Sequence, residues 1–523
     1  TYAEYTVPGL ADHYLRLMSG FNQEWGRNTY FSGQANSLIT PLVTDLNATT
    51  GTQQTWGSKS ARSLRGVFYR LNYSYKDRYL LEANGRYDGT SRFPEDDRFG
   101  FFPSVSVGWR ISNESFMAST SDWLDNLKLR ASYGTLGNQV ILFDNGSQNY
   151  YPSIATMGIG SSPYMMSAGG RIPYVSPAGL VSPSLTWETV VTKNIGLDVM
   201  ILNQRLDFSF DMYQRDTQDM LMDVDFPSLL GTDAPQTNAA DLRTTGWEIS
   251  ATWRDRIGQD WMYSIQLALS DNKSEITEYD NPTGAISEYY IGQEIGEIWG
   301  YETVGIFQTP EEVAQHADQS RLGANWREGD IKYADLNGDG IIDSGSGTLD
   351  DPGDRKIIGY NRDRYAFGIN PDVQYKNFTL SLFFQGRLKR DYLPPNGNWN
   401  AFYPFNAGHI EKLYLTDTSS PENPDAYFAA PHISTNTKKN IHPQSRYVQD
   451  ASYIRLKNIT LSYWLPDNVA NSVGMSRAQV YVSGMNLWEA TGMHAPLDPE
   501  QTQSVTQEYY FDRVYTLGVK VTF

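Results

Sequence analysis

The stretch DLNGDGIID, which begins at Asp335, has the residue types and spacing of a metal-binding loop. Asp335, Asn337 and Asp339 stand at alternate positions and supply side-chain oxygens. Gly340 permits a sharp turn, and Ile341 offers its backbone carbonyl oxygen. This order matches the first half of an EF-hand-like calcium loop, whose ligands fall at positions one, three, five and seven. The spacing predicts a structural Ca²⁺ ion that stiffens an outer loop.

The second half of this loop departs from the calcium pattern. Asp343 stands at position nine, where a ligand can act through water, but position twelve holds Ser346 in place of an acidic residue. The following residues, SGSGTLDDPG, look like an insertion before DRKIIG resumes. The alternative interpretation is a turn rich in Asp and Asn that binds no metal.

Motifs of enzyme chemistry are absent from the sequence. It contains no GxxxxGK[ST] phosphate loop, no HExxH and no GxSxG, and its six histidines are scattered. We therefore expect that the protein is not an enzyme. A Ser/His/Asp set built across distant strands stays open as an alternative, because catalytic triads do not follow sequence order.

Aromatic side chains are concentrated in NGNWNAFYPFN, residues 396–406. Trp399, Phe402 and Tyr403 are candidates for substrate contact, because flat rings stack on sugar rings or on peptide side chains, and exposed apolar patches often mark binding sites. The alternative is that these rings fasten the loop onto itself or onto a lid.

The composition narrows the classes of partner. Lys and Arg number 42 against 60 Asp and Glu, so the formal net charge is −18, which argues against a nucleic-acid surface. The absence of cysteine excludes disulfides, thiolate zinc sites and Cys nucleophiles. The first residues show no signal peptide, so we expect that one was removed or that the numbering begins inside a longer chain.

Apolar and polar residues alternate along the whole chain, which predicts β-strands. Any functional site of this protein must therefore be positioned by strands and by the connections between them. Clear examples are RLDFSFDMY, GWEISATWR and NFTLSLFFQG, and one exception, residues 311–322, predicts a short helix. No apolar run approaches the about 20 residues of a membrane helix, but many of the about fourteen predicted strands approach the ~9–11 residues with which a tilted strand crosses a bilayer. The fold class is therefore all-β, a transmembrane antiparallel β-barrel.

Two features favour a membrane barrel over a large soluble β-protein with one wet face per sheet, which stays the alternative. Tryptophans lie at the ends of the apolar faces, as in interfacial aromatic girdles. The opposite faces carry single charges at mid-strand, which a dry sandwich core would not accept. The tryptophans are Trp109, Trp123, Trp247, Trp253 and Trp261, and the charges include Glu82, Arg86, Lys128 and Arg130.

The connections predicted between strands are of two kinds. Residues 75–79 and 203–206 form tight turns, whereas residues about 138–186, 280–363 and 393–450 form long loops. Loops of that length are uncommon in a compact soluble domain. Outer-membrane barrels have short turns on the inner side and long loops on the outer side.

Several blocks of the sequence closely resemble the TonB-dependent outer-membrane transporters of the SusC/RagA type. The resemblance covers nearly the whole chain, in order. The blocks include LRGVFYRLNYSYKDRYLLEANGRYDGTSRF (64–93), FFPSVSVGWRISNESFM (101–117), LDNLKLRASYGTLGNQ (124–139), residues 185–221, TGWEISATW (245–253), SYIRLKNITLSYWLP (452–466) and the closing YTLGVKVTF (515–523).

This resemblance implies a 22-stranded barrel whose lumen is blocked by an amino-terminal plug. It implies import of a nutrient oligomer, a glycan or an oligopeptide, across a bacterial outer membrane, driven through TonB. It also implies a SusD-like surface lipoprotein as partner, with transporter–lipoprotein pairs forming a dimer.

The chain departs from the family because it has no TonB box, no plug and no early barrel strands. We therefore expect residues 1–523 to be the carboxy-terminal part of a transporter roughly twice as long, with a self-sufficient porin-like barrel or a non-transporting adhesive barrel as alternatives. By comparison with the usual loop of the family, the closing carboxylate of the calcium loop moves to Asp354, with Asp350 or Asp351 as substitutes.

Overall fold

The computed structural model describes residues 1–143, 146–167, 170–223, 235–394, 416–431, 439–494, 498–501 and 511–523. Two compact units share these residues. Unit 1 contains Thr1–Arg110, Arg130–Asn194 and Arg215–Leu242, and unit 2 contains Ile111–Leu129, Ile195–Gln214 and Arg243–Phe523. Each unit is described separately below.

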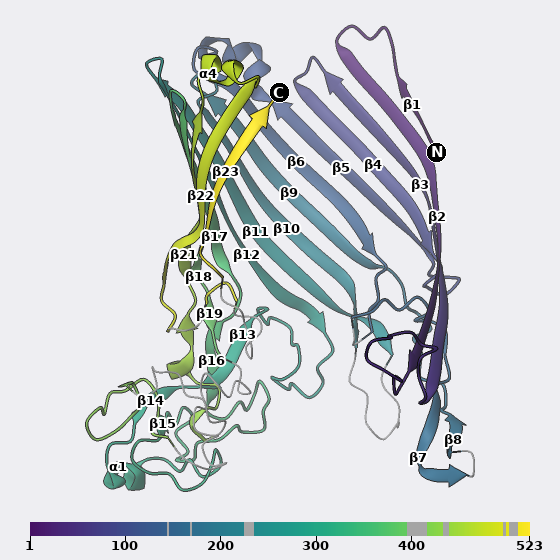
Figure 1. Ribbon diagram of the computed structural model, residues 1–523, viewed down its shortest axis with the longest axis vertical. Helices are drawn as coiled ribbons and strands as arrows, with labels where there is room; N and C mark the ends of the chain where they lie inside the picture. The colour runs from purple at the N-terminus through teal and green to yellow at the C-terminus, as the bar shows by residue number, and fades with distance from the viewer. Residues whose placement is uncertain are drawn as a thin grey trace. The chain divides into compact units, whose positions relative to one another are not determined.

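One antiparallel sheet of 15 strands dominates the part of the chain that the structure describes, close to the about fourteen strands predicted. Its strands pair in the order β1-β2-β3-β4-β5-β6-β9-β10-β11-β12-β17-β18-β21-β22-β23 (Figure 1). Their bounds are β1 Tyr2–Thr6, β2 His13–Ala35, β3 Gln53–Tyr75, β4 Tyr79–Thr90, β5 Phe99–Arg110, β6 Leu124–Asn138, β9 Glu188–Ile201, β10 Leu206–Asp223, β11 Gln236–Ile257, β12 Trp261–Tyr279, β17 Arg364–Tyr375, β18 Phe378–Lys389, β21 Tyr453–Trp464, β22 Arg477–Thr491 and β23 Val514–Thr522.

Among the described residues, eight short strands form two-stranded sheets outside this main sheet. They pair as β7 (Ile159–Ser167) with β8 (Gly170–Val175), β13 (Glu297–Tyr301) with β16 (Arg355–Tyr360), β14 (Thr303–Ile306) with β15 (Ile331–Tyr333), and β19 (Asp391–Tyr392) with β20 (Gln449–Asp450). The described helical segments are η1 Ile111–Asn113, η2 Ser115–Thr120, α1 Pro310–Gln315, η5 Ser445–Tyr447 and α4 Asp467–Ser472.

The helix predicted over residues 311–322 is shorter in the structure, where α1 ends at Gln315. The hydroxyl of Thr309 caps its first turn by accepting a hydrogen bond from the backbone N–H of Glu312, and Pro310 occupies the first helical position. His316 already has extended backbone angles, which ends the helix. Among the described residues, no helix is both long enough and apolar enough to cross a membrane.

Short and long connections alternate along the main sheet, as predicted. Only residues 76–78 join β3 to β4, and only residues 202–205 join β9 to β10. Both turns use left-handed backbone angles, for example at Lys76, Asp77 and Asn203. In unit 2, residues 280–363 join β12 to β17, whereas residues 376–377 join β17 to β18.

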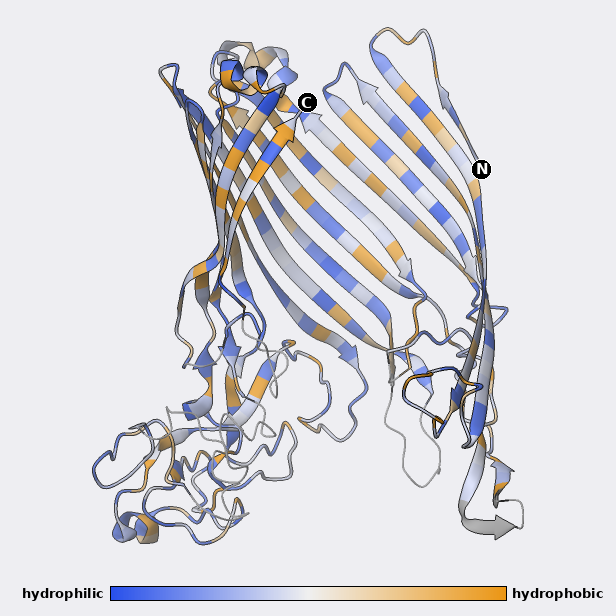
Figure 2. Ribbon diagram, in the orientation of Figure 1, coloured by the Kyte–Doolittle hydropathy of each residue, from blue (hydrophilic) through white to orange (hydrophobic). Residues whose placement is uncertain are grey.

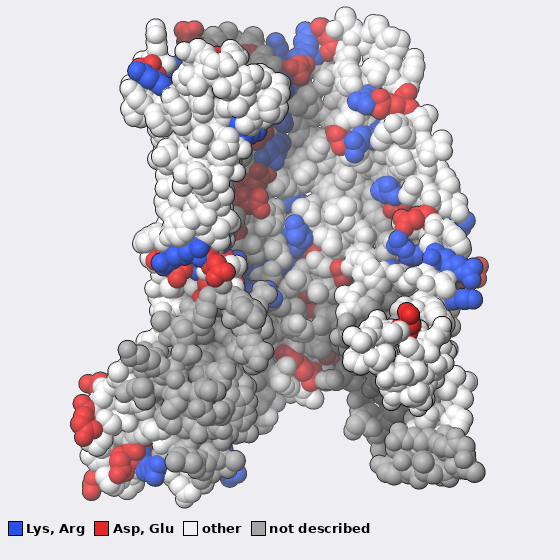
Figure 3. Space-filling model, in the orientation of Figure 1, with Lys and Arg blue, Asp and Glu red and all other residues white. Residues whose placement is uncertain are grey.

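The register of unit 2 places the apolar residues of neighbouring strands on one face of the sheet. Leu380 pairs with Leu461, Leu461 pairs with Val482, and Val482 pairs with Leu517. We call this side the apolar face, and the opposite side, which carries Ser381, Thr460 and Ser483, the polar face. The alternation shows as bands along each strand in Figure 2, and the apolar side of β22 and β23 is a broad uncharged surface in Figure 3. Such a sheet meets lipid on one face and a polar interior on the other.

Rows of aromatic rings border the apolar face where the short turns begin. In unit 2 the row runs through Trp261, Tyr375, Phe378 and Tyr463, which are successive cross-strand partners. The ring centroids of Trp261 and Tyr375 are 4.4 Å apart. In unit 1 an equivalent row contains His13, Tyr75, Tyr79 and Trp109. The predicted girdle is therefore present at Trp109 and Trp261.

The opposite border of the apolar face in unit 2 is marked by Trp247, whose ring lies 6.5 Å from that of Tyr365. On β17, Tyr365 and Tyr375 are ten residues apart. At about 3.4 Å per residue and a tilt of about 35–45°, they lie about 24–28 Å apart across the membrane. This separation matches the about 25 Å height of the lipid-facing band of outer-membrane barrels.

The long connections of unit 2 form a folded body with its own core. We call the described residues 297–360, 416–431 and 439–450 the loop body. Its core is made by apolar side chains that are all more than 90% buried, and a smaller cluster in unit 1 packs Phe93, Ile141, Leu185 and Trp187. The loop-body core contains Tyr301, Ile306, Ile331, Tyr333, Ile342, Phe428, Ala429 and Tyr447.

Candidate functional site

The predicted calcium loop is a sequence of tight turns on the loop body. The Asp335 carboxylate accepts hydrogen bonds from the backbone N–H groups of Gly338 and Gly340, at 2.7 and 3.0 Å. The Asp339 carboxylate accepts from the N–H of Ile341 at 2.7 Å. Both glycines have positive φ, 78° and 82°, which L-residues rarely adopt. The sequence correctly identified the conformation that Gly340 permits.

Asp354, which the comparison with the family predicts as the closing carboxylate, contacts this loop from the far side of the insertion. Its side chain is fully buried and accepts from the N–H groups of Leu336 and Asp343, at 2.7 and 2.9 Å. Asp343 itself accepts from the N–H of Gly345 at 2.7 Å. The loop therefore closes on Asp354.

The Asp335 loop satisfies its carboxylates with its own backbone. Among the described residues, no three His, Cys, Asp or Glu side chains converge on a possible metal position. Of the two substitutes, Asp351 serves a neighbouring turn by accepting from the N–H of Ser346 at 2.8 Å, and hydrogen bonds from Ser346 lower the pKa of its carboxyl group. Calcium binding by Asp335, Asn337, Asp339, Ile341, Asp343 and Asp354 stays a prediction.

The aromatic candidates for substrate contact, Trp399, Phe402 and Tyr403, lie outside the described residues. Their predicted role therefore stays a prediction as well.

A hollow of about 430 Å³ opens on the polar face of unit 2, across strands β10, β11, β12, β17 and β18. It exists because small side chains follow one another on the polar side of β10, β11, β12 and β17. Its lining includes Ser209, Ser250, Ala268, Ser270, Gly368 and Gly386. At Gly386 any Cβ atom would lie 2.2 Å from the carbonyl oxygen of Tyr453, so only glycine allows β18 to approach β21 this closely.

Charges of opposite sign stand at the two sides of the hollow. Asp211 and Glu248 line it on β10 and β11, and Arg387 lines it on β18. The Arg387 guanidinium also pairs with Asp363 at 2.9 Å. Four strand spacings of about 4.8 Å separate β10 from β18, or about 19 Å along the sheet. The hollow can therefore hydrogen-bond a polar solute several units long.

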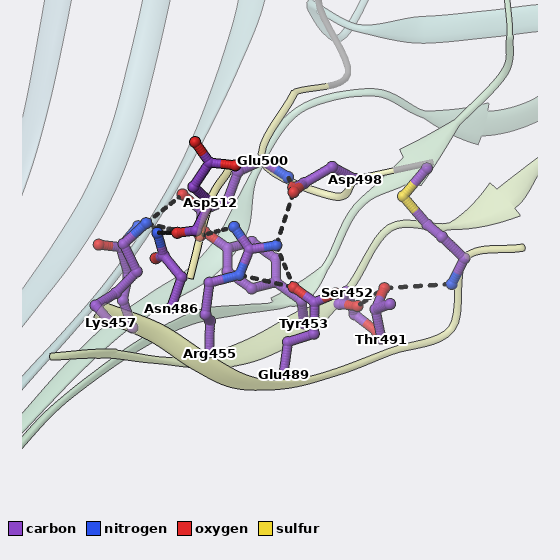
Figure 4. Close-up of polar contacts among 12 residues, drawn as sticks. Ser452, Tyr453, Arg455, Lys457, Asn486, Glu489, Thr491, Asp498, Glu500 and Asp512 are labelled. Carbon is purple, nitrogen blue, oxygen red and sulfur yellow. Dashed lines mark hydrogen bonds and ion pairs between the residues drawn. The ribbon is translucent and has the colours of Figure 1, made fainter. Parts of the chain in front are cut away.

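A buried charge cluster lies on the next strand, β21 (Figure 4). Arg455 is only 2% exposed and makes ion pairs with Glu489, Asp498 and Glu500. Sequence reasoning missed this cluster. Strict alternation from Thr460 would put Arg455 on the apolar face, and it is a β-bulge at Lys457 that shifts the register so that Arg455 pairs with Gln385 on the polar face. No local pattern connects Arg455 to acidic residues more than thirty positions away.

A second buried ion pair joins two connections within the loop body. The Lys439 ammonium lies 2.6 Å from the Asp330 carboxylate, and their side chains are 2% and 0% exposed. Asn440 donates to the same carboxylate at 2.8 Å. Burial in this core also raises the pKa of Tyr301 and of Tyr447 to about 12. These contacts hold the described residues of the two connections together in the loop body.

Comparison with known proteins identifies the family. A family model described as TonB dependent receptor-like, beta-barrel, matches residues 4–385. The chain belongs to this family. Its members are outer-membrane β-barrel receptors and transporters, so the predicted all-β barrel class and outer-membrane location are confirmed.

Relatives of known sequence support the SusC/RagA type. TonB-dependent receptor P3 of Formosa agariphila is 30% identical over 506 residues, which cover 93% of this chain and 47% of the relative. TonB-dependent receptor SusC of Bacteroides thetaiotaomicron is 28% identical over 540 residues, which cover 100% of this chain and 49% of the relative. The chain therefore spans about half the length of the curated relatives that it matches.

Solved structures agree with this fold. The structure of the RagAB peptide transporter superposes with a TM-score of 0.78 at 21% identity, covering 100% of this chain and 55% of that chain. The RagAB peptide importer in its open-open state gives the same TM-score at 22% identity. The predicted resemblance to SusC/RagA-type barrels is confirmed.

Proposed function

We propose that the whole protein imports a nutrient oligomer, a glycan or an oligopeptide, through the outer membrane in a TonB-dependent manner. The observation that carries this proposal is the polar hollow on β10–β18 in a chain of the TonB-dependent receptor family. Serine hydroxyls, two carboxylates and one guanidinium in that hollow can bind hydroxyl-rich or amide-rich chains. The protein then acts as a binding and translocating wall and catalyses no reaction.

The proposal includes the partners of SusC-like transporters. A SusD-like lipoprotein would contact the outer loops, TonB would act through a part of the protein outside residues 1–523, and two transporter–lipoprotein pairs would form a dimer. A calcium ion in the Asp335 loop would stiffen the loop body. The support for these partners is the similarity to SusC, and for calcium it is the spacing of the loop oxygens.

Deletion of the full-length gene tests this function. We expect the deletion strain to lose growth on one polymeric glycan or one peptide mixture and to keep growth on the corresponding monomers. Complementation with the full-length gene should restore growth. Equal growth of the deletion and parent strains on every glycan and peptide mixture would contradict import.

The second candidate is a porin-like or adhesive barrel without active transport. A protonophore separates the two, because TonB-dependent uptake stops when the proton gradient collapses, whereas diffusion through a porin continues. Uptake of the labelled oligomer that survives the protonophore would favour the porin-like alternative.

A further inference from the structure

The four residues 498–501, which follow β22, are fastened to the polar face of unit 2. We call residues 498–501 the strap. The Asp498 carboxylate lies 2.9 Å from one terminal nitrogen of Arg455, and the Glu500 carboxylate lies 2.9 Å from the other. The ammonium of Lys457 lies 3.0 Å from Glu500. Figure 4 shows both carboxylates pointing toward the two cations.

The strap presents its two carboxylates together because it turns on itself. The backbone N–H of Glu500 donates to the Asp498 carboxylate at 2.9 Å, and the N–H of Gln501 donates to the Asp498 carbonyl at 3.1 Å. The side chains of Asp498 and Glu500 are only 9% and 12% exposed. Removal of one partner from an ion pair that is buried in this way costs much more stability than removal of one partner from a surface pair.

Arg455 needs the strap for its own hydrogen bonds. Its cross-strand neighbour Glu489 on β22 accepts from Nε at 2.8 Å and also contacts one terminal nitrogen. The other terminal nitrogen bonds Glu500, which belongs to the strap. Since the guanidinium is fully enclosed, the strap carboxylates complete its set of partners.

The strap stands beside the hollow. Arg455 is the cross-strand partner of Gln385, which lines the hollow, and the Gln385 side chain donates to the Tyr453 hydroxyl at 3.2 Å. The Tyr453 ring lies near two guanidinium groups, 5.8 Å from that of Arg387 and 5.9 Å from that of Arg455. Contacts therefore run without a break from the lining of the hollow to the anchor of the strap.

We propose that Arg455 is a positioning residue that holds the strap at the rim of the hollow and thereby limits the size of the solute that enters it. The inference rests on the proposed import function, because it assigns a specificity element to the surface that solutes reach. Release of the strap would widen the approach to the hollow on the β18 side.

Thiol labelling in the full-length transporter, in outer membranes, tests the strap. The 523 residues contain no cysteine, so once any cysteine in the rest of the full-length protein is replaced with serine, Ser270→Cys supplies a single reporter inside the hollow. The measurement is the labelling rate with bulky polyethylene-glycol maleimide divided by the rate with N-ethylmaleimide. We expect this ratio to rise about tenfold in Arg455→Met and in Asp498→Asn/Glu500→Gln, because each variant removes buried ion pairs that attach the strap.

Two variants are used so that the test remains informative if one of them misfolds. Asp498→Asn/Glu500→Gln preserves shape and leaves Arg455 paired with Glu489, so it reports on the strap even where Arg455→Met fails to assemble. Arg205→Met is the matched control, because it breaks an ion pair with Asp255 in the same unit, in the turn between β9 and β10. That control should leave the ratio unchanged.

An unchanged ratio in the double variant would overturn the proposal. Absence of labelling by both reagents in every variant would also overturn it, because the strap would then not control access. Uptake is measured separately on the strains without the reporter cysteine. A raised ratio in a protein that imports nothing would refute the import function alone, whereas import with an unchanged ratio would refute the strap alone.

Discussion

At the scale of single residues, buried charges organise the connections of this protein. Asp330 accepts from the Lys439 ammonium, from Asn440 and from the N–H of Arg327, so its carboxylate is fully enclosed by donors. Lys439 also donates to the carbonyl oxygen of Asn325 at 2.7 Å. Asp330 and Lys439 are 109 positions apart in the sequence, and their ion pair joins two separate connections into one loop body.

We predict that Lys439→Met destabilises the loop body by about 3–5 kcal/mol, because it leaves the Asp330 carboxylate buried without its counter-charge. Limited proteolysis of the full-length protein as a function of denaturant measures this change. Lys356→Met is the control, because the Lys356–Glu302 pair is about half exposed and should cost at most about 1 kcal/mol. Equal effects of the two substitutions would contradict the prediction.

For the Asp335 loop we predict that Ca²⁺ slows proteolysis within residues 335–354 and that Asp335→Asn and Asp339→Asn remove this effect, because oxygens at these positions would hold the ion. Terbium luminescence on the full-length protein measures binding directly. Asp318→Asn is the control, since the Asp318 backbone pairs with Gly340 and Ile342 of the loop, whereas its carboxylate accepts from Ser320, outside the loop, which lowers the pKa of that carboxyl group. Absence of binding at millimolar Ca²⁺ would refute the site.

At the scale of elements, strand register decides which side chains meet lipid. Leu382 on β18 pairs with Ile459 on β21, four residues from the aromatic row at Phe378 and Tyr463. The adjacent Ser381 faces the polar side and pairs with Thr460. Neighbouring residues on one strand therefore face different environments, lipid for Leu382 and the polar interior for Ser381.

We predict that Leu382→Arg destabilises the protein by about 2–4 kcal/mol in lipid, the cost of an arginine near the middle of the bilayer. Ser381→Arg should cost much less, because its side chain enters the polar interior. Reversible denaturant unfolding in liposomes measures both. A larger loss for Ser381→Arg would reverse the assignment of the two faces.

The loop body should lose stability at alkaline pH. The pKa of Tyr301 and of Tyr447 is raised to about 12 by burial, whereas an exposed tyrosine titrates near 10. Below pH 10 both phenols are neutral in either state. Between pH 10 and 12 only the unfolded state ionises, so stability falls by about 1.4 kcal/mol per pH unit for each tyrosine.

Proteolysis of the loop body across this pH range measures the slope. Tyr301→Phe removes one titrating group, so the loss of stability per pH unit should be smaller by the about 1.4 kcal/mol that one tyrosine contributes. A slope that is the same in Tyr301→Phe and in the parent protein would contradict the assignment.

At the scale of the whole molecule, the hollow and the loop body are both built on the strands and connections of the 15-stranded sheet. Its last strand, β23, pairs with β22 from Val514↔Met485 to Thr522↔Arg477 and covers that strand's backbone donors and acceptors. An uncovered strand inside a bilayer leaves backbone groups without partners, which costs several kcal/mol for each group.

We therefore predict that deletion of residues 514–523 from the full-length protein abolishes its assembly in the outer membrane. Membrane fractionation and the heat-dependent mobility shift of folded barrels on gels measure assembly. Lys520→Gln on the polar side of β23 is the control and should assemble normally. Normal assembly of the deletion variant would contradict the prediction.

Features that depend on local spacing could be predicted from the amino-acid sequence alone. A period of two specifies strands and their two faces, because successive side chains of a strand point to opposite sides. Residues such as Lys76–Asp77 specify tight turns, and Asp335, Gly338 and Gly340 specify the turns of their loop. The separate blocks of similarity specified the family.

Contacts between residues far apart in the sequence became known only from the folded structure. The hollow needs small side chains on four strands in one register, and the Arg455 and Lys439 clusters join residues 34 or more positions apart. Periodicity contains no information on these pairings, because each depends on how the strands and their connections pack. Asp354 belongs partly to each group of features. Comparison with the family pointed to it as the closing carboxylate of the loop, but its burial is seen only in the folded structure.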